Sequence, residues 1–107
     1  MSNLWGIDLG GTKVEGAVLK SATDPQVLFR DRLPTEGDKG YDHILGQIKK
    51  VVDKMEAALG YKPNRMGIAT PGTIDPGTGL MKNSNSTSLN GKPLKADLEK
   101  MLGIQLS

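Results

Sequence analysis

The residues best suited to chemistry form the run Asp8-Leu9-Gly10-Gly11-Thr12-Lys13, which lies between two apolar segments. Two adjacent glycines remove side chains, so a ligand can approach the backbone N–H groups closely. Thr12 adds a hydroxyl donor, and Lys13 could add a positive charge. Asp8 ends a strand that we expect to be buried, where a carboxylate needs a partner such as a magnesium ion or its water shell. These residue types predict a phosphate-binding turn.

An ordinary glycine turn with a solvent-exposed lysine fits the same spacing, because glycine turns are common between strands. The segment lacks the pattern G-x-x-x-x-G-K-[ST], and an apolar strand-like run follows it, whereas a helix follows the G-x-G-x-x-G loop. A phosphate bound here would therefore meet a β-turn and a hydroxyl group, and not a helix N-terminus.

The elements that position this turn follow from hydrophobic periodicity. Apolar residues recur at helical spacing from Tyr41 to Leu59, and Gly60 stands where a C-terminal cap is expected. The predicted order is β-β-β-α-β-α-β, with strands 4–9, 14–19 and 27–33, a helix 41–59, a strand 66–69, a helix 93–102 and a strand that begins at 104. The segments 34–40, 70–79 and 80–89 are expected to be loops.

The composition of the chain disfavours a nucleic-acid-binding protein and a membrane-spanning protein. The 107 residues suffice for one domain, and 14 basic and 12 acidic residues give a net charge of +2 with the two signs mixed along the chain. No basic stripe favours nucleic acid, and no apolar run approaches the roughly 20 residues that span a bilayer. The chain has no cysteine, which excludes disulfides and thiolate metal sites and fits a cytoplasmic protein.

The segment Gly6–Lys13 resembles the first phosphate motif of the ROK family (repressors, open reading frames and kinases), which belongs to the actin-like, ribonuclease-H-like ATPase superfamily. The resemblance continues in register through 67–72, 79–87 and 89–94, and so covers nearly the whole chain. The segments 83–87 and 89–94 are most similar to bacterial ROK fructokinases. The resemblance implies an α/β, ribonuclease-H-like domain over residues 1–107.

The resemblance also implies roles for single residues. Asp8 would orient the magnesium ion of Mg-ATP. The β- and γ-phosphates would be held by Gly10, Gly11, Thr12 and Lys13. Among these residues, Thr12 is expected to contribute more than Lys13.

Sugar contacts are implied in the loops after the fourth predicted strand, at the strand ends where open α/β sheets bind ligands. Gly72 and Thr73 would border the sugar, and the Asn85 amide would bind a sugar hydroxyl. A turn asparagine that bonds its own backbone is the alternative for Asn85, and we expect Asn83 and Asn90 to be structural.

A carboxylate must accept or orient the proton of the attacking hydroxyl. In ROK kinases this Asp follows the strand that here starts at Ile104, and it would lie beyond Ser107. The family's glutamate and histidine sugar ligands, its zinc-binding cluster and its adenine-binding lobe also lie later. No catalytic residue or zinc ligand is therefore assigned, and the 107 residues alone are expected to be a truncated, inactive N-terminal domain.

The resemblance implies an ATP-dependent hexose kinase, a homodimer at full length, that prefers fructose over glucose, mannose or an N-acetylhexosamine. One alternative is a sugar-responsive transcriptional regulator of the same family, although only three residues precede Leu4, where a DNA-binding helix-turn-helix would be expected. The other is an actin-like filament protein or heat-shock chaperone ATPase, which the sugar-loop match disfavours.

Four further side chains are given structural interpretations. We expect His43 to be solvated, Asp75 to be a turn residue, Asp97 to be exposed on a helix and Trp5 to pack in the core or at an edge.

Overall fold

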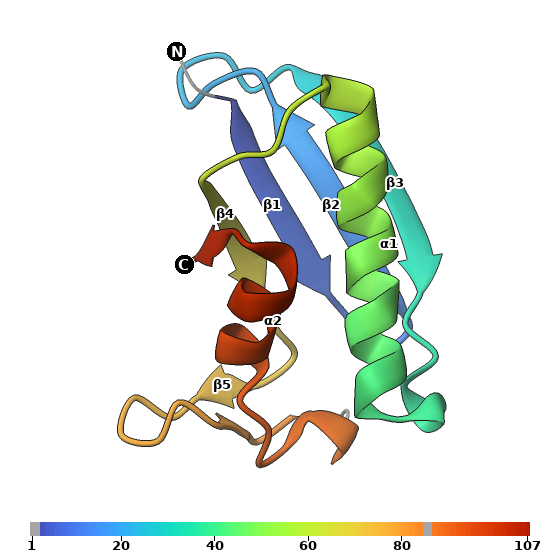
Figure 1. Cartoon of the computed structure of the whole chain (residues 1–107), viewed down its shortest axis with the longest axis vertical. Coiled ribbons are helices and arrows are strands. Elements are labelled where there is room, and N and C mark those ends of the chain that lie inside the picture. The colour runs from blue at the N-terminus through green and yellow to red at the C-terminus, as the bar shows by residue number, and fades with distance from the viewer. Residues whose placement is uncertain (1–2, 85–86) are drawn as a thin grey trace.

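A five-stranded mixed sheet organises the chain, in the order β3-β2-β1-β4-β7 (Figure 1). The computed structural model describes residues 3–84 and 87–107. Strands β1, β2 and β3 pair antiparallel, and β4 and β7 run parallel to β1. The strands span Leu4–Leu9 (β1), Lys13–Leu19 (β2), Val27–Pro34 (β3), Arg65–Ala69 (β4) and Gln105–Leu106 (β7). The predicted α/β class is confirmed.

Two helices cover one face of the sheet, toward the viewer in Figure 1. Helix α1 spans Tyr41–Leu59 as predicted and ends at Gly60, whose φ is 79° and whose N–H donates to the carbonyl of Glu56. Helix α2 spans Leu94–Leu102. The core fills the space between the sheet and the helices, with buried side chains that include Ile7, Leu9, Val14, Val18, Ile48, Val52 and Leu98.

Gly16 in β2 sets the distance between the sheet and α1. A Cβ atom at this position would lie 2.6 Å from both Met55 Sδ and Val51 Cγ1. Because these separations are below any normal contact, the missing side chain lets α1 pack directly on β2.

Two predicted loops contain short elements. A 3₁₀ turn, η1, spans Gly37–Lys39. The segment after β4 forms a small antiparallel hairpin of β5 (Thr73–Ile74) and β6 (Met81–Lys82), followed by a 3₁₀ turn, η2, at Thr87–Leu89. Strands of two residues are too short to leave a periodic pattern, so the sequence predicted loop here.

Asp75 forms the expected turn, because its Oδ1 accepts a hydrogen bond from Gly77 N at 2.8 Å. The expectation that Asp97 is exposed is wrong. The Tyr41 hydroxyl donates to Asp97 Oδ2 at 2.6 Å, where α1 meets α2, and both residues are half-buried. Burial and then this hydrogen bond raise the pKa of Tyr41.

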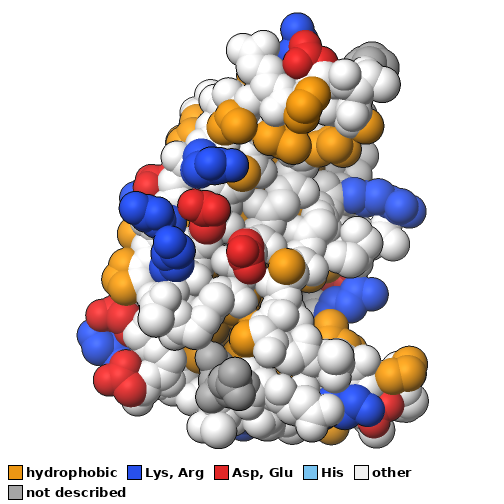
Figure 2. Space-filling model, turned by 180° about the vertical axis from the view of Figure 1, so that it is seen from behind, with side chains coloured by type: hydrophobic (Ala, Val, Ile, Leu, Met, Phe, Trp, Pro, Cys, Tyr) orange, Lys and Arg blue, Asp and Glu red, His pale blue; other side chains and the backbone are white. Residues whose placement is uncertain are grey.

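Both described α-helices lie on the near side of the sheet in Figure 1, and Figure 2 shows the molecule from behind. Apolar side chains gather toward one end of this view, and the large exposed hydrophobic residues of the sheet are Leu4, Val27 and Leu28. Trp5, by contrast, is buried as predicted, and its Nε1 donates to the Tyr61 hydroxyl at 2.9 Å. In residues 3–84 and 87–107 no helix is long and apolar enough to cross a membrane.

Candidate functional site

The glycine turn joins β1 to β2. The two strands pair from Leu4 opposite Leu19 to Leu9 opposite Val14, and Gly10 N then donates to Lys13 O at 2.9 Å. Gly11 and Thr12, at the tip of the turn, are exposed. Within the described ranges no protein acceptor takes a hydrogen bond from the N–H groups of these two residues. Such exposed, unpaired N–H groups can bind the oxygens of an anion.

The segment that follows β3 holds the turn through two hydrogen bonds. Thr35, which follows β3, donates from Oγ1 to Gly10 O at 2.8 Å and from its backbone N to Thr12 O at 2.9 Å. Its side chain is buried, with 1% exposure. Sequence reasoning missed this residue because its position depends on the register in which Pro34 faces Lys13, and a register between neighbouring strands is not visible in one sequence.

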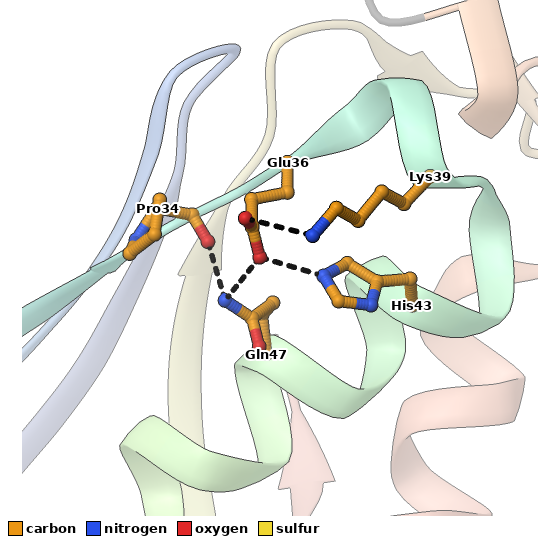
Figure 3. A network of polar contacts seen from close by, with 5 residues as sticks. All are labelled: Pro34, Glu36, Lys39, His43 and Gln47. Atoms are coloured by element: carbon orange, nitrogen blue, oxygen red, sulfur yellow. Dashed lines mark hydrogen bonds and ion pairs between the residues drawn. The ribbon is translucent and has the colours of Figure 1, made fainter.

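Glu36 joins this segment to helix α1 (Figure 3). Its carboxylate lies 2.8 Å from His43 Nε2 and accepts from Lys39 Nζ at 3.1 Å and from Gln47 Nε2 at 3.4 Å. Gln47 Nε2 also donates to Pro34 O at 2.6 Å. The hydrogen bond with His43, and then the one with Lys39, hold the pKa of the Glu36 carboxyl below its ordinary value. His43, expected to be solvated, is only partly exposed, because its ring faces Glu36.

A hollow of about 530 Å³ lies beside the turn. One wall is the tip of the turn, and the others are the segment after β3 and the η2 turn. Ser88 Oγ donates to Gly37 O at 3.0 Å and so ties the last two walls together. The lining residues are Gly11, Thr12, Pro34, Glu36, Gly37, Asp38, Thr87 and Ser88. This mixture offers N–H donors at one side and carboxylates and hydroxyls at the others.

The loop from 70 to 92 is held together by close backbone contacts and side-chain bonds. A Cβ at Gly72 would lie 2.6 Å from Lys82 O and 2.9 Å from Ser84 N, so only glycine fits here. Asn90 Oδ1 accepts from Ser84 N at 2.9 Å, and its Nδ2 donates to Ser84 O at 3.1 Å. Asn90 is thus structural, as predicted. Asn83 has a φ of 58°, a conformation that asparagine tolerates better than most residues.

Asp8 lies where β1 ends, opposite Ala69 of the parallel strand β4. The turn after β1 and the loop after β4 therefore begin at the same edge of the sheet, as expected for an α/β site. The expectation of a buried Asp8 is wrong, since this residue is exposed, alternates with the buried Ile7 and Leu9, and does not line the hollow. Its carboxylate forms no hydrogen bond or ion pair with the described residues, which leaves it free to orient a hydrated cation.

The structure brings only part of the predicted site together. Gly11 and Thr12 line the hollow. The other predicted residues among those described do not, and these are Asp8, Gly10, Lys13, Gly72 and Thr73. Lys13 and Thr73 are exposed, and Thr73 pairs with Lys82 in the β5–β6 hairpin. The predicted sugar ligand Asn85 lies outside the described residues. Across the described part of the chain no group of three or more His, Cys, Asp or Glu side chains could hold a metal ion.

The sequence matches the model of the ROK family over residues 4–107, and the chain therefore belongs to the ROK family. It is 32% identical over 99 residues to an N-acetyl-D-glucosamine kinase of Pasteurella multocida, a match that covers 92% of this chain and 31% of that protein. The corresponding enzyme of Escherichia coli O7:K1 is 35% identical over 98 residues, with the same coverage of 92% and 31%. The chain thus spans about a third of the length of these relatives.

Solved ROK structures have the same fold. The chain superposes on a ROK hexokinase from Thermus thermophilus with a TM-score of 0.80 at 24% identity, over 98% of this chain and 34% of that one. A ROK family glucokinase from Streptomyces griseus, solved with glucose and AMPPNP, gives a TM-score of 0.80 at 21% identity, over 98% and 32%. The ribonuclease-H-like, actin-like fold predicted from the sequence is thereby confirmed. The curated relatives named above are N-acetylglucosamine kinases, so a special similarity to fructokinases is not supported.

Proposed function

We propose that this chain is the N-terminal, phosphate- and sugar-binding portion of an ATP-dependent hexose kinase. The observation that carries the proposal is the tip of the glycine turn, where two exposed N–H groups without protein partners lie beside a hollow shared with the loop after β4. An anion held by the turn would lie next to a ligand held by the carboxylates and hydroxyls of the other walls. Phosphoryl transfer requires this juxtaposition of a phosphate and a sugar hydroxyl.

The turn supplies the groups that meet the charge of the transferring phosphoryl. The N–H groups of Gly11 and Thr12 and the Thr12 hydroxyl donate to phosphate oxygens, and they are fixed before the ligand arrives, so little reorganisation is needed. Gly10 allows the phosphates to approach the backbone, and Lys13 adds charge from the exposed end of β2. The free Asp8 carboxylate orients the hydrated Mg²⁺ that accompanies ATP, and this ion neutralises phosphate charge.

Gly72, Thr73 and the Asn85 amide are proposed as sugar contacts from the family resemblance, although Gly72 and Thr73 do not line the hollow beside the turn. Fructose was the sugar expected from sequence, but the names of the relatives favour N-acetylglucosamine, with glucose next and mannose and fructose behind. We assign no catalytic base to these 107 residues, so the complete kinase performs the reaction.

The proposal is tested by purifying the full-length protein that carries these residues and measuring ADP release with N-acetylglucosamine, glucose, mannose and fructose. We expect Mg²⁺-dependent phosphorylation of at least one of them. Thr12→Val should lower kcat/KM for ATP by at least about tenfold, because a donor to the phosphate is lost. Lys13→Gln should have a smaller effect, and Thr23→Val, in the exposed β2–β3 turn, should have none.

Two results would contradict the proposal. If no sugar is phosphorylated although sugars still bind, the chain belongs to a sugar-responsive regulator. If Thr12→Val and Thr23→Val behave alike, the turn does not hold the phosphates.

A further inference from the structure

Thr35 is a buried hydroxyl residue in a segment that the sequence presents as loop. It follows β3 and precedes η1, and its exposure is only 1%. A buried hydroxyl is costly unless it is hydrogen-bonded. The Thr35 hydroxyl donates its hydrogen bond to the turn between β1 and β2, and not to a residue of its own segment.

The two hydrogen bonds of Thr35 go to the carbonyls of Gly10 and Thr12, the residues before and after Gly11. Oγ1 donates to Gly10 O at 2.8 Å, and the backbone N donates to Thr12 O at 2.9 Å. Because a trans peptide unit is planar, the carbonyl of Gly10 and the N–H of Gly11 belong to one plane and point in opposite directions. Fixing the carbonyl toward the buried Thr35 therefore turns the Gly11 N–H away from Thr35, and Gly11 is one of the residues that line the hollow.

Without such a contact this peptide unit would be poorly defined. Both residues that flank it are glycines, which rotate about their backbone bonds with little steric restraint. The hairpin's own bond from Gly10 N to Lys13 O closes the turn but does not involve the Gly10 carbonyl, which is bonded by Thr35 instead.

Thr35 is itself held firmly. The residue before it, Pro34, accepts a hydrogen bond from Gln47 Nε2 at 2.6 Å. The residue after it, Glu36, has a φ of 53° and is held in this left-handed conformation by the cluster of Lys39, His43 and Gln47 (Figure 3). The anchor of the turn is thus tied to helix α1 on both sides.

We propose that Thr35 is a positioning residue for phosphate binding: its hydroxyl fixes the peptide between Gly10 and Gly11 so that the Gly11 N–H is already directed at the phosphate. The proposal rests on the proposed function of the turn. A donor oriented before binding lowers the free energy of the charged state more than one that must first reorient.

The test compares Thr35→Val, Thr35→Ser and Ser21→Ala in the full-length protein. Valine keeps the shape of threonine and the backbone bond to Thr12 but removes the hydroxyl, and serine restores it. Ser21 is the matched control, because it is also buried and its Oγ accepts from Asp24 N at 3.0 Å in the turn at the other end of β2.

For Thr35→Val we expect the KM for ATP to rise about fivefold to tenfold while the KM for the sugar stays within about twofold. Thr35→Ser should recover most of the wild-type value, and Ser21→Ala should change neither KM. A merely structural Thr35 would lower the melting temperature without this separation of the two KM values. A uniform change in both, or an equal change in Ser21→Ala, would overturn the proposal.

A second measurement does not depend on kinase activity. Amide ¹⁵N relaxation should show that residues 10–13 are as rigid as the flanking strands in the wild type and more mobile in Thr35→Val, with Thr35→Ser close to the wild type. Unchanged relaxation in Thr35→Val would overturn the positioning role even if the enzyme is active. Inactivity of the wild-type protein on every sugar would instead remove the proposed function, and the relaxation data would still decide whether Thr35 fixes the turn.

Discussion

The glycine turn and the loop from 70 to 92 lie at the same edge of the sheet but are built differently. Strand pairing and one neighbouring segment hold the turn, and the side chains of its own residues contribute no internal hydrogen bond among the described residues. The loop contains the short β5–β6 pairing and several backbone bonds, but side chains of its own residues add further bonds. Thr70 Oγ1 donates to Gly72 O, Asn90 bonds the Ser84 backbone, and the Thr78 hydroxyl accepts from Leu80 N.

This difference separates two tasks. A site built from the register of a sheet keeps its geometry when surface residues change, which suits a ligand such as ATP that does not vary. A loop built from individual side-chain bonds changes shape with single substitutions, which suits the part of the site that distinguishes one sugar from another. Under the proposed function, sugar preference would be adjusted in the loop while the turn stays constant, and the predictions below test this division.

The largest effect is expected from Gly72→Ala. The new Cβ would collide with backbone atoms, Lys82 O at 2.6 Å and Ser84 N at 2.9 Å, so the loop must move. We expect a loss of about 1–3 kcal/mol in the free energy of unfolding, as for other overpacked sites, and weaker sugar binding. ATP binding should be unchanged, because the turn is held independently. Urea unfolding and calorimetric titration measure these effects.

Gly77→Ala is the matched control within the same loop. Its Cβ would have only an ordinary contact, at 3.4 Å from Asp75 Oδ1. Equal effects of the two alanines, or an equal loss of ATP and sugar binding in Gly72→Ala, would contradict the separation of turn and loop.

Asn90→Ala should have an intermediate effect. It removes both hydrogen bonds to the Ser84 backbone, and we expect a loss of about 1 kcal/mol, because the side chain is exposed and water replaces part of the interaction. Asn90→Asp keeps the acceptor for Ser84 N and should lose less. Chemical denaturation compares both with Asn64→Ala, an exposed asparagine whose side chain has no partner in the described part of the chain. A neutral Asn90→Ala would show that the clamp does not hold the loop.

The smallest effect is expected on the pH dependence of stability, through the Glu36 carboxyl. Because His43 and Lys39 hold the pKa of this carboxyl below its ordinary value of 4.5, the folded state binds the proton more weakly than the unfolded state. The stabilisation is complete above pH 4.5 and is lost as the pH falls through the folded-state pKa. Glu36→Gln should therefore flatten the acid side of a plot of unfolding free energy against pH.

Asp31 also contributes to the loss of unfolding free energy at acid pH, since the Arg32 N–H and then Lys54 lower the pKa of its carboxyl. Glu36→Gln should remove only part of the slope for this reason. Glu56→Gln, which removes a carboxylate without a partner among the described residues, is the control for the loss of one negative charge. An unchanged slope in Glu36→Gln would show that the cluster in Figure 3 does not persist in solution.

Local patterns in the sequence predicted much of the fold. Helix α1 begins and ends where its apolar spacing and Gly60 place it, and β1 has the predicted bounds, because both patterns extend over several residues. The short β5–β6 hairpin was missed, since two-residue strands leave no periodicity. The chemical character of the turn was also visible, because two glycines and a threonine are local features.

The supports of the site were not predictable in the same way. Thr35 reaches Gly10 only through the pairing of β2 with β3, and Glu36 reaches His43 only because the chain turns back onto α1. The exposure of Asp8 was misjudged because β1 is apolar apart from this residue and was read as a buried strand, while only its inward-facing residues are covered. Contacts between elements depend on register and on which face is covered, and a single sequence fixes neither.

The uncovered face of the sheet has a practical consequence for work with this chain. Strand β3 is an edge strand, and its middle carries Arg30, Asp31 and Arg32, charges that discourage pairing with another copy. Its first residues, Val27 and Leu28, are apolar and exposed, at 46% and 40%. We therefore expect concentrated samples of these 107 residues to self-associate through this corner, and Leu28→Lys is the first change to make before crystallisation or NMR.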